Sequence, residues 1–247
     1  MRLLFIAAAL AAFCAPSLAS DLAGIEAGTG MLYSNGRPVC SAQIVHSKPG
    51  KGDAGTETIV LTANHCVHSK DEEFAFAVPT YTEDADMLKV TLYGATVLKQ
   101  EAKSDIAVFK LRDTETTLAA VDVATPEEAK AALIKGTRIL AIGFPGTSYL
   151  PMKDLIVTDG LYVGKTDALS PGANAKFYRT TISVFYGNSG GGLYVQVGEE
   201  WKLVGVTSEL DPERMWNTSL FSPVDTKSSF LRGAWNPDLS DPAYREK

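Results

Sequence analysis

The sequence has few histidines and cysteines, the residue types typical of zinc sites. Only three of its 247 residues are histidine and three are cysteine. No pair among the histidines has the spacing of a familiar zinc motif, so we expect neither a metal ion nor a cofactor. Internal repeats and low-complexity tracts are also lacking, which excludes repeat architectures.

Positive charge is scarce as well. The chain has 23 basic and 29 acidic residues and a formal net charge of −6. This acidity argues against a nucleic-acid partner. The acidic stretch 71–86 is interpreted as a solvated loop.

Long apolar runs are lacking beyond the first nineteen residues, so no membrane-spanning segment is expected there. Residues 1–19 have the features of a secretory signal: a basic Arg2, an apolar run from Leu3 to Phe13, and a small-x-small site at Ser17-Leu18-Ala19. We therefore expect a secreted or periplasmic protein that does not contact the membrane after removal of the signal.

Two cysteines, Cys40 and Cys66, remain after that removal. An even number in an exported chain implies one disulfide. It would close a loop of about 27 residues and stabilise the fold by roughly 3–4 kcal/mol in the chain-entropy model. The bridge would also hold the backbone of the adjacent His65.

Short apolar or alternating runs, broken by glycine and polar turns, predict an all-β fold. The first series of candidate strands is Gly30–Tyr33, Val39–His46, Thr58–Thr62, Met87–Tyr93, Ala95–Lys99 and Ile106–Leu111. The second is Arg138–Phe144, Leu155–Val163, Lys176–Val184, Gly192–Val197, Trp201–Thr207 and Thr218–Val224. Six plus six strands indicate two β units. Asn35-Gly36 predicts a hairpin turn in the first.

Two short helices are predicted outside the strands. Thr125 is suited to an N-cap, Pro126 to the first helical position, and Glu128 completes a capping box. A second helix is expected to begin at Asp225 and to end near Gly233. The resulting division is a signal at 1–19, a first unit at 20–118, a linker at 119–136, a second unit at 137–235 and a loosely held tail at 236–247.

The glycine-rich segment Gly187-Asn188-Ser189-Gly190-Gly191 presents one hydroxyl in a sharp turn. A serine needs a base to take its proton, and the base needs a third group to orient it. Among the histidines, His65 ends an apolar strand beside a cysteine and is the best candidate for the base. Asp105 precedes the apolar strand 106–111 and is the candidate for the third group.

The order of these residues along the chain separates the known scaffolds. Gly187–Gly191 also fits the nucleophile turn of α/β-hydrolases, but that fold needs a histidine after the serine and none follows Ser189. In subtilisins the acid comes before the histidine. The order His65, Asp105, Ser189 is that of chymotrypsin.

The segments 61–66, 105–111 and 187–191 resemble the motifs of the chymotrypsin-like, or trypsin-like, serine proteases. The resemblance implies two six-stranded antiparallel β-barrels with the active site between them. It also implies that Ser189 is the nucleophile, His65 the base and Asp105 its orienting acid. By the same resemblance, the N–H groups of Gly187 and Ser189 form the oxyanion hole, and Cys40–Cys66 is the disulfide beside the histidine.

Two departures from the animal digestive members are evident. Asn188 replaces the acid that pairs with a new N-terminus in those enzymes, and no Ile-Val-Gly-Gly segment follows residue 19. We therefore expect no activation by such an ion pair. Gly-Asn-Ser-Gly-Gly is similar to bacterial members such as glutamyl endopeptidases and high-temperature-requirement proteases.

The resemblance also places four candidate substrate-binding residues. Ser183 aligns with the floor of the specificity pocket, where an aspartate would select lysine or arginine. Ser208 and Leu210 are expected to offer backbone hydrogen bonds to an extended peptide, while Glu209 is either a pocket charge or a solvated residue. We expect a monomer that binds a protein or peptide substrate. The alternative is a catalytically silent binding protein on the same fold.

Overall fold

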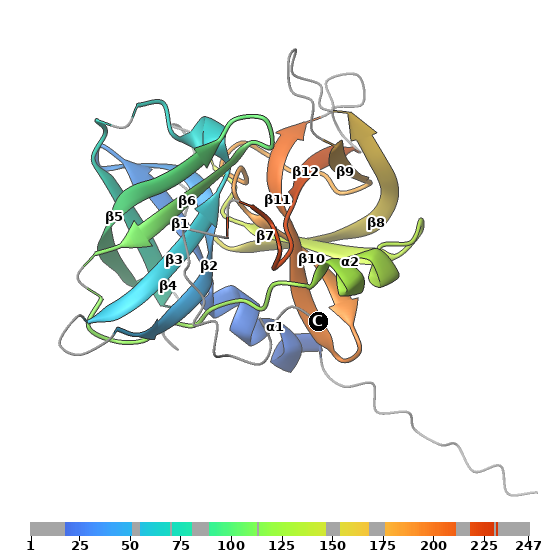
Figure 1. Cartoon of the computed structure of the whole chain (residues 1–247), viewed down its shortest axis with the longest axis horizontal. Helices are drawn as coiled ribbons and strands as arrows, with labels where there is room; N and C mark the ends of the chain where they lie inside the picture. The colour runs from blue at the N-terminus through green and yellow to red at the C-terminus, as the bar shows by residue number, and fades with distance from the viewer. Residues whose placement is uncertain are drawn as a thin grey trace, which may run out of the picture.

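Two closed β-barrels contain all twelve strands of the part of the chain that the structure describes (Figure 1). The structure is a computed structural model, and it describes residues 18–50, 55–69, 71–80, 89–112, 114–146, 154–167, 176–210, 218–229 and 231. Each barrel has six antiparallel strands, so the expected two-barrel, all-β fold is confirmed.

The first barrel closes in the order β1-β2-β3-β6-β5-β4. Its strands are β1 (Thr29–Ser34), β2 (Arg37–Pro49), β3 (Thr56–Thr62), β4 (Phe74–Thr80), β5 (Lys89–Glu101) and β6 (Ile106–Leu111). Asn35 and Gly36 join β1 to β2 with φ angles of 48° and 76°. Two left-handed residues match the twist of a two-residue hairpin, as the sequence predicted.

The sequence prediction was wrong for β4. Phe74–Thr80 lies in the acidic stretch that we interpreted as a solvated loop, yet Phe74 and Phe76 are buried in the first barrel. The surrounding acids masked an alternating pattern that suits a strand with one face in the core. The rest of that stretch, from residue 81, lies outside the described residues.

The prediction also divided one strand into two. β5 is a single strand in the described range, whereas two strands had been expected on either side of Gly94. At Gly94 a Cβ atom would lie 2.9 Å from the guanidinium of Arg112, so the glycine admits a side chain across the strand rather than ending it. Residues 87 and 88, the start of the first expected strand, lie outside the described residues.

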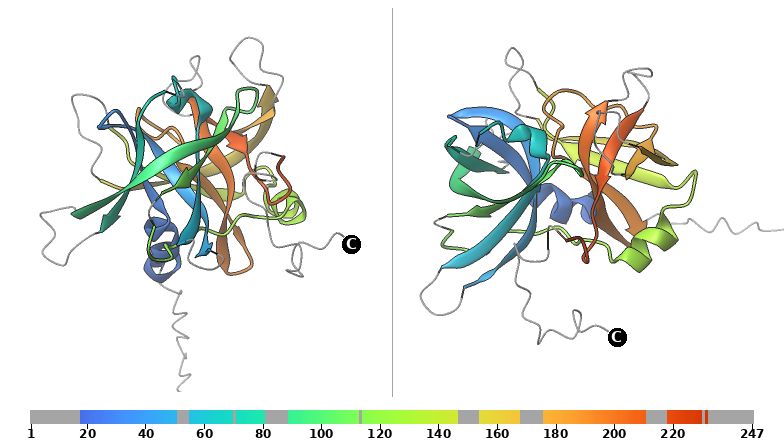
Figure 2. Two further views of the ribbon diagram at one scale, coloured as in Figure 1. Left: turned by 60° about the vertical axis from the view of Figure 1, so that its left-hand side comes forward. Right: turned by 45° about the horizontal axis from the view of Figure 1, so that its top comes forward.

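The second barrel closes in the order β10-β11-β12-β9-β8-β7. Its strands are β7 (Arg138–Gly143), β8 (Ile156–Asp167), β9 (Lys176–Thr180), β10 (Gly192–Val197), β11 (Glu200–Leu210) and β12 (Ser219–Pro223). Each overlaps one strand of the predicted second series. The two barrels lie side by side in the right view of Figure 2.

Helix α2 (Pro126–Ala132) lies between the barrels in sequence and confirms the predicted linker helix. The Thr125 hydroxyl accepts a hydrogen bond from the Glu128 N–H, and the Glu128 carboxylate accepts one from the Thr125 N–H at 2.8 Å. This capping box satisfies two N–H groups at the start of the helix.

The second predicted helix is not formed in the described residues after Asp225, which make turns. The Asp225 carboxylate accepts from the Lys227 N–H at 2.9 Å, and the Ser228 hydroxyl accepts from the Asp225 N–H at 3.0 Å. Such short side-chain bonds to the backbone compete with helix formation. The expected end at Gly233 lies outside the described residues.

Helix α1 (Leu18–Ala27) crosses beneath the two barrels and contacts β1, β4 and β11 (Figure 1). Its Ile25 is buried in a core cluster that contains residues of both barrels, among them Leu61 of β3 and Leu203 of β11. One apolar cluster therefore spans the two barrels, and each barrel also has a buried cluster of its own. α1 begins inside the segment interpreted as a signal, and residues 1–17 lie outside the described part.

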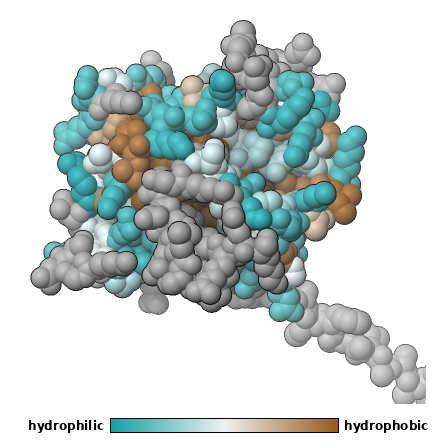
Figure 3. All heavy atoms as spheres, in the orientation of Figure 1, coloured by the Kyte–Doolittle hydropathy of each residue, from teal (hydrophilic) through white to brown (hydrophobic). Residues whose placement is uncertain are grey.

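The described surface is mainly hydrophilic in the view of Figure 3, where apolar residues gather in small areas. Within the described part of the chain, no helix has the length and apolarity to cross a membrane.

The expected disulfide is present and joins β2 to the 3-10 turn η1 (Asn64–Cys66), with Cα atoms 6.2 Å apart at Cys40 and Cys66. The double variant C40A/C66A should lower the free energy of unfolding by about 3–4 kcal/mol, because a loop between residues 26 apart is no longer closed in the unfolded chain. Guanidinium denaturation of the oxidised wild type and of the variant measures this difference. Equal denaturation midpoints would contradict the prediction.

Candidate active site

The three side chains singled out in the sequence form one hydrogen-bonded line. His65 Nδ1 lies 2.8 Å from Asp105 Oδ2, and His65 Nε2 lies 2.8 Å from Ser189 Oγ. The first barrel supplies His65 and Asp105, while Ser189 lies in the loop before β10 of the second. Residues 124 positions apart thus meet at the junction of the barrels.

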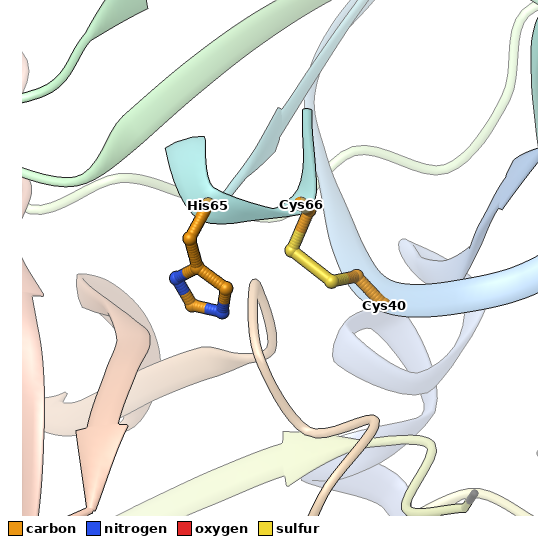
Figure 4. A group of neighbouring side chains, drawn as sticks. All are labelled: Cys40, His65 and Cys66. Atoms are coloured by element: carbon orange, nitrogen blue, oxygen red, sulfur yellow. A yellow bond between two sulfur atoms is a disulfide. The ribbon is translucent and has the colours of Figure 1, made fainter. Parts of the chain in front are cut away.

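Hydrogen bonds to Asp105 and the disulfide of the adjacent Cys66 hold His65 in position. It lies in η1, directly after β3, and its backbone N–H donates to Asp105 Oδ1 at 2.9 Å. Figure 4 shows His65 and Cys66 on the same short turn, with the disulfide reaching Cys40. The Asp105 carboxylate therefore binds both the backbone and the ring of His65, which fixes the position and the tilt of the imidazole.

Asp105 has a backbone φ of 49° in the turn before β6. This left-handed conformation is uncommon for residues other than glycine, and aspartate tolerates it better than most. The carboxylate points toward His65, as its two hydrogen bonds with that residue show. Its side chain is only 14% exposed.

Ser208 of β11 donates a hydrogen bond to Asp105 Oδ2 at 2.5 Å. The register of β11 against β12 shifts between Thr207 and Glu209, so Ser208 occupies a bulge that re-aims its side chain. The sequence analysis predicted that Ser208 binds substrate and did not predict this contact with Asp105. No residue pattern in the sequence indicated the bulge that directs the side chain.

The electrostatics of His65 combine opposing effects. Burial by itself lowers the pKa of the imidazole, but the hydrogen bond to Asp105 and the charges of Asp105 and Glu209 raise it, and the pKa lies above the ordinary 6.5. Glu209 is half-buried in β11. It therefore supports the charged imidazole from the second barrel, a role that the sequence did not suggest.

The Ser189 loop is built from glycines that leave no room for a side chain. Gly187 and Gly190 have φ angles of 87° and 81°. A Cβ on Gly190 would lie 2.1 Å from the carbonyl oxygen of Ser41, and one on Gly187 would lie 2.7 Å from the backbone of Gly146. Glycine is needed at both positions, because only a residue without a side chain permits this close approach of the backbone.

Two peptide groups of this loop have fixed orientations. The carbonyl of Tyr186 accepts from the Gly146 N–H at 2.8 Å, and that of Asn188 accepts from the Gly191 N–H at 2.7 Å. In a trans peptide the next N–H points the opposite way, which here is the N–H of Gly187 and that of Ser189. Within the described residues neither of these two N–H groups donates a hydrogen bond.

A cleft of about 540 Å³ opens beside these groups. His65 and Ser189 lie on its wall, together with Tyr186, Gly187, Ser208 and Glu209. Of the other candidate substrate-binding residues, Ser183 is half-buried next to Val184, which lines the cleft. Leu210 is the last residue of β11, and the structure describes its backbone only.

Cys40, His65 and Cys66 have ligand atoms within 4.8 Å of one another, a spacing that could hold a metal ion. Their two sulfur atoms are joined in a disulfide, however, and metal binding requires the thiolates. The cluster in its oxidised form does not fit a metal site.

Comparison with known proteins places the chain in a family. Residues 28–206 match the trypsin-like peptidase domain. A probable periplasmic serine endoprotease DegP-like from Pseudomonas savastanoi pv. phaseolicola is 28% identical over 175 residues, which cover 65% of this chain and 31% of that protein. The chain thus spans about a third of the length of this relative.

Solved structures agree on the fold. The protease domain of MamO from Magnetospirillum magneticum superposes with a TM-score of 0.61 at 18% identity, covering 81% of this chain and 94% of that one. The Rv3671c protease in an inactive form gives 0.58 at 15% identity, covering 85% and 91%. The protein belongs to the family of trypsin-like peptidase domains.

The balance of effects at His65 can be measured without a substrate. The imidazole of His65 should titrate above 6.5 in an NMR pH titration, and Asp105→Asn should lower its midpoint because it removes the nearest negative charge. Burial lowers the pKa of His46, which serves as the internal control and should keep its midpoint in the variant. A His65 midpoint unchanged by the substitution would refute this account.

Proposed function

We propose that the protein is a secreted or periplasmic serine endopeptidase that cleaves peptide bonds through an acyl-enzyme intermediate. The observation that carries the proposal is the continuous line from Asp105 through His65 to Ser189, with both ring contacts at 2.8 Å. Membership of the trypsin-like peptidase domains and the match to a DegP-like endoprotease support it.

In the acylation step, Ser189 Oγ attacks the scissile carbonyl and His65 Nε2 takes its proton. The charged imidazole is stabilised by Asp105, which itself receives the Ser208 hydrogen bond. The N–H groups of Gly187 and Ser189 receive the negative charge that develops on the carbonyl oxygen. His65 then gives its proton to the leaving amine, and water hydrolyses the acyl-enzyme by the same steps.

The substrate proposed is an extended peptide bound in the cleft. The backbone of Ser208 and Leu210 would pair with it as an added strand. Ser183 carries no charge, so this position does not select lysine or arginine, while Glu209 places one negative charge at the cleft. Profiling a peptide library identifies the side chain that this combination prefers.

Export and monomeric state are part of the same proposal. Export is supported by the signal-like residues 1–19 and by the disulfide, since such bonds persist in oxidising compartments. N-terminal sequencing of the mature protein tests the first point, and light scattering tests the second.

Ser189→Ala should abolish labelling by a fluorophosphonate probe and lower the turnover of casein by roughly a millionfold, because the nucleophile is removed. Ser47→Ala is the matched control, since it deletes a buried hydroxyl of β2 that bonds Thr58, away from the cleft. A correctly folded wild-type chain that neither reacts with the probe nor cleaves casein would favour the silent binding protein instead.

A further inference from the structure

Ser41 of β2 connects the first barrel to the Ser189 loop. Its N–H donates to the carbonyl of Ser189 at 2.8 Å, and its hydroxyl donates to the carbonyl of Gly187 at 2.8 Å. Its own carbonyl accepts from the Thr62 hydroxyl of β3, also at 2.8 Å. Ser41 has no exposed surface, so these bonds do not compete with water.

The same hydroxyl has a second partner in the second barrel. The N–H of Phe144, directly after β7, donates to Ser41 Oγ at 2.8 Å. The oxygen therefore accepts from one segment of the second barrel and donates to another. One side chain of the first barrel thereby couples the end of β7 to the loop that carries the nucleophile.

The hydrogen bonds of Ser41 lie next to the peptide whose N–H is proposed to bind the oxyanion. Gly187 has a left-handed φ, and a glycine can exchange such a conformation for others at little cost. Its N–H belongs to the peptide whose carbonyl, on Tyr186, is bound by Gly146. Ser41 binds the carbonyl of the next peptide, which is that of Gly187 itself. Each of the two peptides that flank the Gly187 Cα is therefore restrained by a hydrogen bond.

We infer that Ser41 is a positioning residue that holds the N–H of Gly187 in the orientation needed to receive an oxyanion. The inference rests on the proposed function. Ser41 does not itself contact the reacting atoms, and Asn188 in the same loop carries no charge that could hold the loop through an ion pair. The neutral hydroxyl in the neighbouring barrel supplies that restraint.

Deleting the hydroxyl has a defined effect. Ser41→Ala leaves the carbonyl of Gly187 and the N–H of Phe144 buried without their partner, which favours rotation of the loop toward other acceptors and donors. The bond from the Ser41 N–H to Ser189 remains, as does the line from Asp105 to Ser189. The variant therefore disturbs the N–H group proposed to bind the oxyanion and leaves the nucleophile and the base in place.

The test compares two reactions of residue 189. Phosphonylation by a fluorophosphonate forms an Oγ–P bond, releases fluoride and passes the hydroxyl proton to His65, while the phosphoryl oxygen occupies the oxyanion site. In a Ser189→Cys background, iodoacetamide alkylates the thiol with loss of iodide and forms no oxyanion. Both reactions depend on His65, and only the first depends on the Gly187 N–H.

Ser41→Ala should slow phosphonylation by about 10- to 100-fold, somewhat less than the loss of an oxyanion donor itself, which costs roughly 100- to 1000-fold. The same substitution in the Ser189→Cys background should change the alkylation rate by less than about twofold. Ser47→Ala, the matched deletion from β2, should leave both rates unchanged. Thermal unfolding of each variant confirms that folded protein is compared.

Ser41→Thr keeps a hydroxyl at this position, and its phosphonylation rate per active site should return to within a few-fold of the wild type. Normal phosphonylation in Ser41→Ala, or an equal loss in both reactions, would overturn the inference and leave the proposed function intact. Failure of the wild-type chain to react with the probe would instead refute both.

Discussion

The chemistry proposed here requires groups from two separate barrels to stay within 2.8 Å of one another, and the contact between the barrels is what ensures it. A shared apolar core, which includes Leu61 of the first barrel and Leu203 of the second, resists separation. Apolar packing has little directional preference, however, and by itself it would allow the barrels to slide. The directional component comes from hydrogen bonds across the junction.

Those hydrogen bonds run in both directions. Ser41 of the first barrel binds the Ser189 loop of the second, and Ser208 of the second binds Asp105 of the first. Deeper in the junction, Tyr194 of β10 donates to the side-chain oxygen of Gln43 in β2, and both residues are fully buried. Because a buried polar group without a partner is costly, small displacements of one barrel are penalised at each of these points.

Most strands could be predicted because their signals are local, whereas the two closed barrels were implied by the resemblance to chymotrypsin-like proteases. The turn at Asn35-Gly36, the capping box at Thr125 and most strands follow from residue types and their spacing along the chain. β4 was missed because its alternation lies among acids that resemble a loop. The helix expected from Asp225 is replaced by turns in the described residues, although the sequence pattern suits a helix. The hydrogen bond from the Lys227 N–H to the Asp225 carboxylate favours the turn.

The candidate triad was predictable for a different reason, namely that three separate motifs occur in one order. Ser41 offered no such signal: a serine in a strand after a cysteine is unremarkable until the partner barrel is placed beside it. The same holds for the hydroxyl of Ser208, whose direction depends on a bulge in β11. Contacts that depend on the relative position of two barrels are a property of their packing, and the sequence of either segment alone does not contain them.

Residues of the candidate site differ in how firmly the fold holds them. The reacting groups are restrained by bonds to strands: His65 through the disulfide to β2, and the Ser189 loop through Ser41. The cleft wall, by contrast, includes Phe185 and Tyr186, which are 57% and 74% exposed. On the proposed function, these exposed side chains line the substrate cleft, whereas the bond that restrains the Ser189 loop is made by the buried Ser41 of β2.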